Sequence, residues 1–199
     1  MADRSVRFFD AQFRRQIAAS DFTLNPFEQA ALSYVRGRVL DLGCGLGNLS
    51  IAAARQGAHV VAVDASLPAI VRIAQVSRAE DLGMVAVYSD VLRYRLVGEY
   101  DSIVAIGLLT FMGRDAALDL LSEIAHHVAP GGCAVINVLV EGTTYMEMFD
   151  PASYCLFPPD EIEQHFAGWR IELSKHETFA APGGTCKAFA TLVARKPGL

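Results

Sequence analysis

Residues 38–50 read Arg-Val-Leu-Asp-Leu-Gly-Cys-Gly-Leu-Gly-Asn-Leu-Ser, and this stretch decides the fold. It begins as a short apolar strand, breaks at three glycines in alternate positions, and continues as an amphipathic helix through Leu49, Ile51 and Ala54. Because glycine lacks a Cβ atom, the backbone can turn with φ > 0 and approach a bound molecule closely. The start of the helix leaves free N–H groups that point at that molecule. A strand, a glycine turn and a helix in this order predict the first βα unit of a nucleotide-binding sheet.

The spacing of the glycines separates this turn from two other nucleotide-binding loops. The dinucleotide fingerprint needs glycine at its first, third and sixth positions. Here the third glycine comes one residue early, and Asn48 takes the sixth position. No Gly-Lys-Ser/Thr follows, so the stretch is not a P-loop either.

At these residues the chain resembles the class I S-adenosylmethionine-dependent methyltransferases, whose first motif reads Asp-x-Gly-x-Gly-x-Gly. The motif falls here on Asp41, Gly43, Gly45 and Gly47, with Cys44 inside the loop. The resemblance implies that the loop wraps the methionine part of the cofactor, and that the acid lies near its ammonium group, often through water. A glycine turn in another kind of α/β protein is the alternative at this motif.

A second acid follows the next apolar segment. Residues 59–64 read as a buried strand that ends in Asp64, about 20 residues after the glycines. An acid at this strand end accepts hydrogen bonds from both ribose hydroxyls, because a carboxylate offers two acceptor oxygens to a vicinal diol. The alternative is a cap for the helix expected over 67–79, although Ser66 is the better placed cap.

The resemblance also assigns residues after the next two strands, expected over 84–88 and 100–107. Asp90 and Val91 are implied to contact the adenine, through the carboxylate and the backbone N–H respectively. Residues from Ile106 onward leave their strand at the cofactor end, and Asp101 has a structural role at the other end. The full expected cofactor set is Asp41, Gly43, Cys44, Gly45, Gly47, Asp64, Ala65, Ser89, Asp90, Val91, Ile106 and Gly107.

The remaining pattern predicts an α/β fold with a doubly wound, seven-stranded, mostly parallel sheet that closes with an antiparallel C-terminal hairpin. This is the Rossmann-like methyltransferase fold, and plain dehydrogenase folds do not close in this way. Further helices are expected over 5–18, 26–35, 114–127 and 160–166, and further strands over 133–140, 169–178 and 188–194, with turns at 130–132 and 181–184. We expect one domain over 1–199 with a core over 25–196. Residues 1–24 either cover the cofactor like a lid or form an appended surface helix.

Composition limits the partners. The 199 residues are 52% hydrophobic, and the net charge of −5 argues against a nucleic acid, which needs a basic face. There is no apolar run long enough for a membrane span, and the N-terminus lacks the apolar core of a signal peptide, so we expect a cytoplasmic protein. We expect it to be a monomer or a homodimer. The four cysteines lack C-x-x-C spacing and no histidine pair has i, i+4 spacing, so no metal site is expected.

The C-terminal third resembles the tellurite-resistance methyltransferase branch in three segments, 156–162, 166–169 and 189–196. In that branch a histidine and nearby arginines on the last hairpin are thought to face the substrate. His176 fits the histidine, and we take it as the tentative substrate-side catalytic residue, but its neighbour is Glu177 and the turn lacks basic residues. This departure puts tellurite in doubt, because an oxyanion favours positive charge.

The expected function is therefore methyl transfer from S-adenosylmethionine to a small molecule, with S-adenosylhomocysteine as the product. The acceptor candidates are a chalcogen oxyanion such as tellurite, a small thiol and a phenol. The long irregular segment 141–157 follows the fifth strand and is the expected place for substrate contacts. Two other functions stay open, a nicotinamide-dependent oxidoreductase and a non-catalytic module that binds the cofactor.

Overall fold

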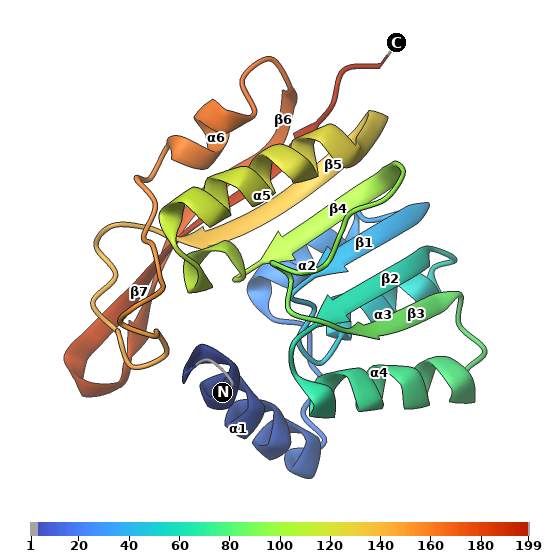
Figure 1. The fold of residues 1–199 in the computed structure, drawn as a ribbon, viewed down its shortest axis with the longest axis horizontal. Coiled ribbons are helices and arrows are strands. Elements are labelled where there is room, and N and C mark those ends of the chain that lie inside the picture. The colour runs from blue at the N-terminus through green and yellow to red at the C-terminus, as the bar shows by residue number, and fades with distance from the viewer. Residues whose placement is uncertain (1–3, 199) are drawn as a thin grey trace.

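The computed structural model describes residues 4–198, so the parts of the expectations that fall on residues 1–3 and 199 lie outside it. Seven strands form one sheet in the order β3-β2-β1-β4-β5-β7-β6 (Figure 1). The first five are parallel to one another, and β7 is antiparallel to both β5 and β6. This confirms the predicted sheet and its closing hairpin. The strands are β1 (Arg38–Leu42), β2 (His59–Asp64), β3 (Met84–Tyr88), β4 (Tyr100–Ile106), β5 (Val128–Leu139), β6 (Arg170–Ala181) and β7 (Thr185–Arg195).

Helices cover both faces of this sheet. The α-helices are α1 (Arg4–Ala19), α2 (Pro26–Leu32), α3 (Asn48–Arg55), α4 (Leu67–Ala79), α5 (Arg114–His127) and α6 (Glu161–His165), with short 3₁₀ turns η1 (Leu109–Phe111) and η2 (Pro182–Gly184). One hydrophobic core lies between the sheet and α5 with α6, and the other lies between the sheet and α2, α3 and α4. Burial on both faces explains why the parallel strands read as continuous apolar runs. It also makes the carboxyl edge of the sheet the place where a ligand can reach several strand ends.

Local signals set the start of α2. Asn25 accepts hydrogen bonds from the N–H groups of Phe27 and Glu28, and the Glu28 carboxylate accepts the N–H of Asn25 at 2.8 Å. This is the predicted capping box. The helix ends at Leu32, earlier than predicted, and the chain then turns through Gly37 into β1.

The fifth strand differs from the prediction. We expected a turn at residues 130–132, whereas β5 begins at Val128 and passes through this segment. Val128 pairs with Tyr100 and Cys133 pairs with Ser102, so the intervening residues of β5 bulge opposite a single residue of β4. Gly131 has φ of +75°, which lets the chain make the extra bend and rejoin the ladder.

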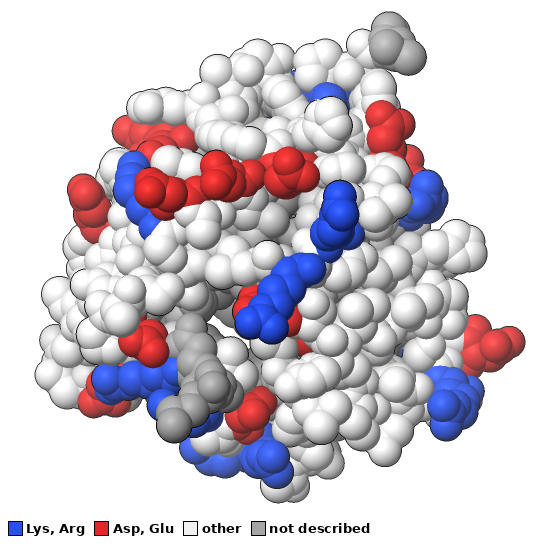
Figure 2. Space-filling model, in the orientation of Figure 1, with Lys and Arg blue, Asp and Glu red and all other residues white. Residues whose placement is uncertain are grey.

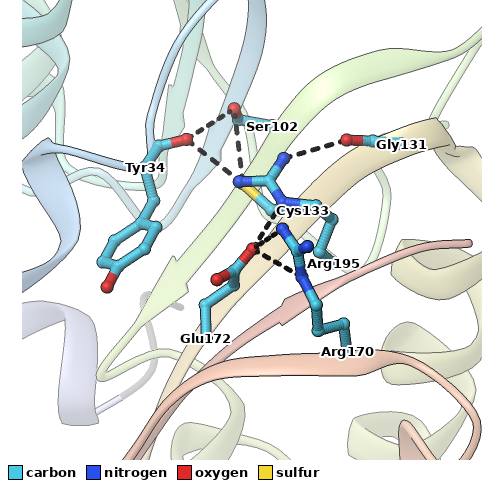
Figure 3. A network of polar contacts seen from close by, with 7 residues as sticks. All are labelled: Tyr34, Ser102, Gly131, Cys133, Arg170, Glu172 and Arg195. Carbon is cyan, nitrogen blue, oxygen red and sulfur yellow. Dashed lines mark hydrogen bonds and ion pairs between the residues drawn. The ribbon is translucent and has the colours of Figure 1, made fainter.

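A polar network ties the sheet together at the end away from the glycine turn (Figure 3). The Glu172 carboxylate accepts hydrogen bonds from Arg170 and Arg195, and Arg195 Nη1 donates to the carbonyl of Gly131 at 2.9 Å. Beside it, the thiol of Cys133 lies 3.2 Å from the carbonyl oxygen of Tyr34. Both arginines pair with the Glu172 carboxylate, and Arg195 also binds backbone, so we interpret this end of the sheet as structural.

Acidic side chains form a row over α5 (Figure 2). Asp115, Asp119 and Glu123 are exposed and follow one another at i, i+4 spacing. Such a row repels a phosphate backbone. None of the described helices is long and apolar enough to cross a membrane.

Candidate functional site

The glycine turn after β1 has a shape that side chains would disrupt. Gly43, Gly45 and Gly47 have φ of +66°, +53° and +70°. A Cβ atom on Gly43 would lie 2.8 Å from Leu108, and one on Gly47 would lie 2.6 Å from Ile73. Glycine is therefore required by the backbone angle at all three positions and by space at two of them. Helix α3 starts directly after Gly47 without a side-chain cap, so its first N–H groups are free to bind a ligand.

Asp64 at the end of β2 braces this turn. One carboxylate oxygen accepts the N–H of Gly45 at 2.8 Å and the other accepts the N–H of Ser66 at 2.7 Å. Burial raises the pKa of Asp64, and these N–H groups oppose that rise. Each oxygen still has a lone pair for a further donor, as a ribose diol would require. Ser66 is the N-cap residue of α4, as predicted. Its hydroxyl donates to Asp10, however, and makes no capping hydrogen bond.

Asp41 is buried beneath the turn. Its carboxylate accepts a hydrogen bond from the Ser50 hydroxyl at 2.6 Å. The pKa of Asp41 is raised to about 7. Burial is the largest cause, the hydrogen bond from Ser50 opposes the rise, and the negative charges of Glu28 and Asp64 add to it. Burial also raises the pKa of Glu28. Within residues 4–198, none of these three acids forms an ion pair, so this part of the edge is suited to a positively charged ligand.

The residues after β3 continue the same edge. The N–H of Ser89 donates to the Asp64 carbonyl at 3.0 Å, which places this turn beside the end of β2. The Asp90 carboxylate accepts the N–H of Leu92 at 3.0 Å and is otherwise exposed, while Val91 is half-buried. Asp90 thus starts a turn and keeps one carboxylate oxygen for an external donor.

The backbone at the end of β4 borders open space. Ile106 is the last residue of the strand, and Gly107 follows with φ of +64°. The N–H of Gly107 donates to the Asn137 carbonyl at 2.9 Å, yet a Cβ atom on Gly107 would meet nothing within 4 Å. The bare backbone next to open space marks a position where a ligand can approach.

Helix α1 lies across this edge (Figure 1). A Cβ atom on Gly45 would be 3.1 Å from the ring of Phe13. The ring of Phe9 packs edge-on against Phe111 in η1 at 5.0 Å. Asp10 binds Ser66 next to Asp64. The helix therefore contacts the ends of β1, β2 and β4, and this position is consistent with the lid expectation.

The predicted cofactor residues thus gather at or just after the ends of β1, β2, β3 and β4, which are neighbours in the sheet. Cys44 and Ala65 belong to the loops after β1 and β2. Burial, with the charges of Asp41 and Asp64, raises the pKa of Cys44 well above its ordinary value, so this residue stays a thiol. Within residues 4–198, no three His, Cys, Asp or Glu side chains are placed to hold a metal ion.

His176 lies apart from this group. It is on β6, the edge strand, where it pairs with Ala190 and is exposed. One ring nitrogen, Nε2, lies 3.0 Å from the carbonyl oxygen of Pro159, which precedes α6. Its role on the substrate side stays a prediction.

Sequence reasoning missed several contacts at the site. Ser50 as the partner of Asp41 and Phe13 over Gly45 were not predicted, nor was Arg72, which donates to the Leu46 carbonyl. The contact of Ser50 could have been predicted from the sequence, because Ser50 lies in the first turn of the helix that starts at the glycine turn. The other two depend on how α1 and α4 pack, which no local pattern reports.

Known methyltransferases resemble this chain in sequence. Residues 39–132 match a family described as a methyltransferase domain. The chain therefore resembles the class I S-adenosylmethionine-dependent methyltransferases. Hemagglutinin 1 of Eikenella corrodens is 28% identical to it over 184 residues, 88% of this chain and 60% of that protein. The probable S-adenosyl-L-methionine-dependent methyltransferase TehB of Haemophilus influenzae is 24% identical over 166 residues, 80% of this chain and 57% of that protein.

Solved structures agree on the fold of this chain. TehB from Haemophilus influenzae superposes with a TM-score of 0.73 at 21% identity, over 87% of this chain and 62% of that one. A Burkholderia thailandensis 1,6-didemethyltoxoflavin-N1-methyltransferase, with its substrate and S-adenosylhomocysteine bound, superposes with a TM-score of 0.67 at 20% identity, over 99% and 91%. The chain spans about three fifths of the length of the two sequence relatives. The nicotinamide alternative is set aside, and the family resemblance, including its closeness to the TehB branch, is confirmed.

Proposed function

We propose that the chain transfers the methyl group of S-adenosylmethionine to a small-molecule acceptor at the carboxyl edge of the sheet. The observation that carries this proposal is a group of three acids around a glycine turn that exposes N–H groups. These acids, Glu28, Asp41 and Asp64, form no ion pair with the residues that the structure describes. The cofactor has a sulfonium, an ammonium, a carboxylate and a ribose diol. Acids suit its cations and diol, and N–H groups suit its carboxylate, so the residues fit it.

When bound, the cofactor supplies an electrophilic methyl carbon whose bonding electron pair stays with sulfur as the acceptor's lone pair forms the new bond. The protein's role is to position the acceptor against the methyl carbon and to exclude water from the site. Asp64 would hold the ribose, Asp41 the ammonium group, and Asp90 with Val91 the adenine. Helix α1, with Phe9 and Phe13, would cover the site.

The acceptor is the finer part of the proposal. The candidates are a chalcogen oxyanion, a small thiol and a phenol. The resemblance of segments 156–162, 166–169 and 189–196 to the tellurite-resistance branch favours the first of them. A soft chalcogen or a thiolate needs no base, whereas a neutral phenol must lose a proton during the reaction. His176 is the tentative base for that case, and the bond of Nε2 to a backbone carbonyl would leave Nδ1 as the basic nitrogen.

The test is release of S-adenosylhomocysteine with tellurite, selenite, small thiols and phenols as acceptors. Turnover with any of them supports methyl transfer, and the acceptor that reacts assigns the substrate class. Tight cofactor binding without turnover over the whole panel would contradict catalysis and favour a module that only binds the cofactor. Absence of binding of S-adenosylhomocysteine would refute the proposed site itself.

A further inference from the structure

Strand β6 forms an open edge of the sheet. Among the described residues, its backbone pairs with β7 alone, and no loop forms a backbone hydrogen bond to its outer side. Six of the seven residues in the range 174–180 are exposed, and the seventh, Glu177, is half-buried. A row of free N–H and C=O groups at a sheet edge is a template for a further strand, and proteins usually shorten or block such edges. The opposite edge is short, because β3 has only five residues, whereas β6 has twelve.

The helices beside β6 contact its two faces and not its edge. On one face, the ring of Phe179 packs edge-on against Phe27 of α2, with 5.6 Å between the ring centres. On the other face, the Ser174 hydroxyl donates to the Glu163 carboxylate of α6 at 2.8 Å. The backbone groups of β6 that point outward in the plane of the sheet have no backbone partner within residues 4–198, so they are available to another strand.

The charges on this edge are complementary to themselves. Lys175 and Glu177 lie on the same face of β6, because side chains alternate along a strand. Neither forms an ion pair with any residue that the structure describes. When two β6 strands pair antiparallel about a two-fold axis at His176, Lys175 of each copy lies directly opposite Glu177 of the other. One such contact therefore contains two Lys–Glu pairs.

The same register matches the neighbouring positions. It sets the half-buried Leu173 opposite the exposed ring of Phe179, and on the other face it sets Ser174 opposite Thr178. Apolar pairs, hydroxyl pairs and opposite charges are the cross-strand pairs that stabilise a sheet. The register shift of β6 against β7 just before Leu173 ends the regular part of the strand, so the matched stretch is 173–179.

The nearest other symmetric registers lack this match. Residues directly opposite each other point to the same face, so the two-fold axis has to pass through a residue position and not between two residues. An axis at Lys175 would place the two Lys175 side chains opposite each other, and an axis at Glu177 would do the same with two carboxylates. Like charges directly opposite are destabilising, so the charges select the register at His176.

We propose that β6 pairs with β6 of a second copy of this chain, in the antiparallel register centred on His176, and that this edge is the contact of a homodimer. The pairing joins two seven-stranded sheets into one and covers both open edges at once. The contact lies beyond β5 and β7, away from the strand ends that carry the expected cofactor residues, so the proposal does not depend on methyl transfer. The place of His176 at the axis competes with its tentative role as a base.

The test exchanges the charges and measures dimerisation by sedimentation velocity over a range of protein concentrations. The wild type should show a monomer–dimer equilibrium. K175E and E177K should each raise the dissociation constant of the dimer by roughly 10- to 100-fold, because each places like charges opposite each other twice in the contact. The double variant K175E/E177K, and an equimolar mixture of the two single variants, should restore the dimer, since opposite charges then face each other again.

Two controls separate the contact from general effects of charge. K175E and E177K change the net charge in opposite directions, so a loss of dimer in both is not an effect of net charge. R78E makes the same charge change as K175E at an exposed position of α4, beside the opposite edge of the sheet, and should leave the dissociation constant unchanged. Circular dichroism of each variant verifies that it is folded.

Several results would overturn the inference. These are a wild type that stays monomeric at every concentration, a dimer that K175E and E177K leave unchanged, and a mixture of the two that does not dimerise. Hydrogen exchange of the wild type at low and high protein concentration locates the contact without any variant. The amides of residues 173–179 should exchange more slowly in the dimer, and slowing confined to other segments would contradict the proposed edge.

Discussion

Replacing Asp64 with alanine should have two measurable effects. The carboxylate accepts the N–H groups of Gly45 at 2.8 Å and Ser66 at 2.7 Å, and both bonds disappear in the variant. A hydrogen bond to a charged group contributes about 1.5–3 kcal/mol, and the cost of burying the charge offsets part of it. We therefore expect the free energy of unfolding to fall by about 2–4 kcal/mol. If the same group holds the ribose, losing one such bond should raise the Kd for S-adenosylhomocysteine about 10- to 150-fold.

The two effects are separated by urea unfolding and by calorimetric titration of S-adenosylhomocysteine. Asp101→Ala is the matched control, because the Asp101 carboxylate accepts the N–H of Arg38 at 2.7 Å at the opposite end of the sheet. This control should lose stability and keep its affinity. Unchanged affinity in Asp64→Ala, or an equal loss of affinity in Asp101→Ala, would refute the placement of the ribose at Asp64.

Three further predictions follow from the site. Because burial raises the pKa of Asp41 to about 7 from 3.8, the folded state keeps a proton that the unfolded state releases. The free energy of unfolding should therefore fall between pH 4 and pH 7, by up to about 4 kcal/mol, and urea unfolding of Asp41→Asn should show a flatter profile. Gly47→Ala should destabilise by about 1–3 kcal/mol, because φ is +70° and the new Cβ would meet Ile73 at 2.6 Å, while Gly113→Ala, at φ of −63° in open space, should change thermal stability little. If α1 closes over the cofactor, S-adenosylhomocysteine should slow tryptic cleavage after Arg14 and Arg15, and an unchanged cleavage rate would contradict the lid.

The sequence predicted those features that depend on short-range chemistry. The capping box at Asn25 and the left-handed glycines at 43, 45 and 47 are local requirements, and all were found. The mostly parallel sheet with its antiparallel closing hairpin was also predicted, because continuous apolar runs that alternate with helices allow few sheets. The position of Asp64 could be predicted because a strand end is fixed by the strand itself.

Features that depend on packing between distant segments could not be predicted. The bulge in β5 arises because Gly131 and Gly132 have to fit beside β4 and the end of β7, and the same residues in isolation read as a turn. The contact of Phe13 with the glycine turn depends on the position of α1 across the sheet.

The acids beneath the glycine turn also bear on how a catalytic cycle would end. Glu28, Asp41 and Asp64 lack ion pairs within the described chain, so they attract a bound cation strongly. Under the proposed function, methyl transfer converts a sulfonium into a neutral thioether, and the bound molecule loses one positive charge. The ammonium group and the ribose, which Asp41 and Asp64 would hold, are unchanged by the reaction. The product would therefore keep most of the donor's contacts and compete with it for the site, and turnover would slow as S-adenosylhomocysteine accumulates.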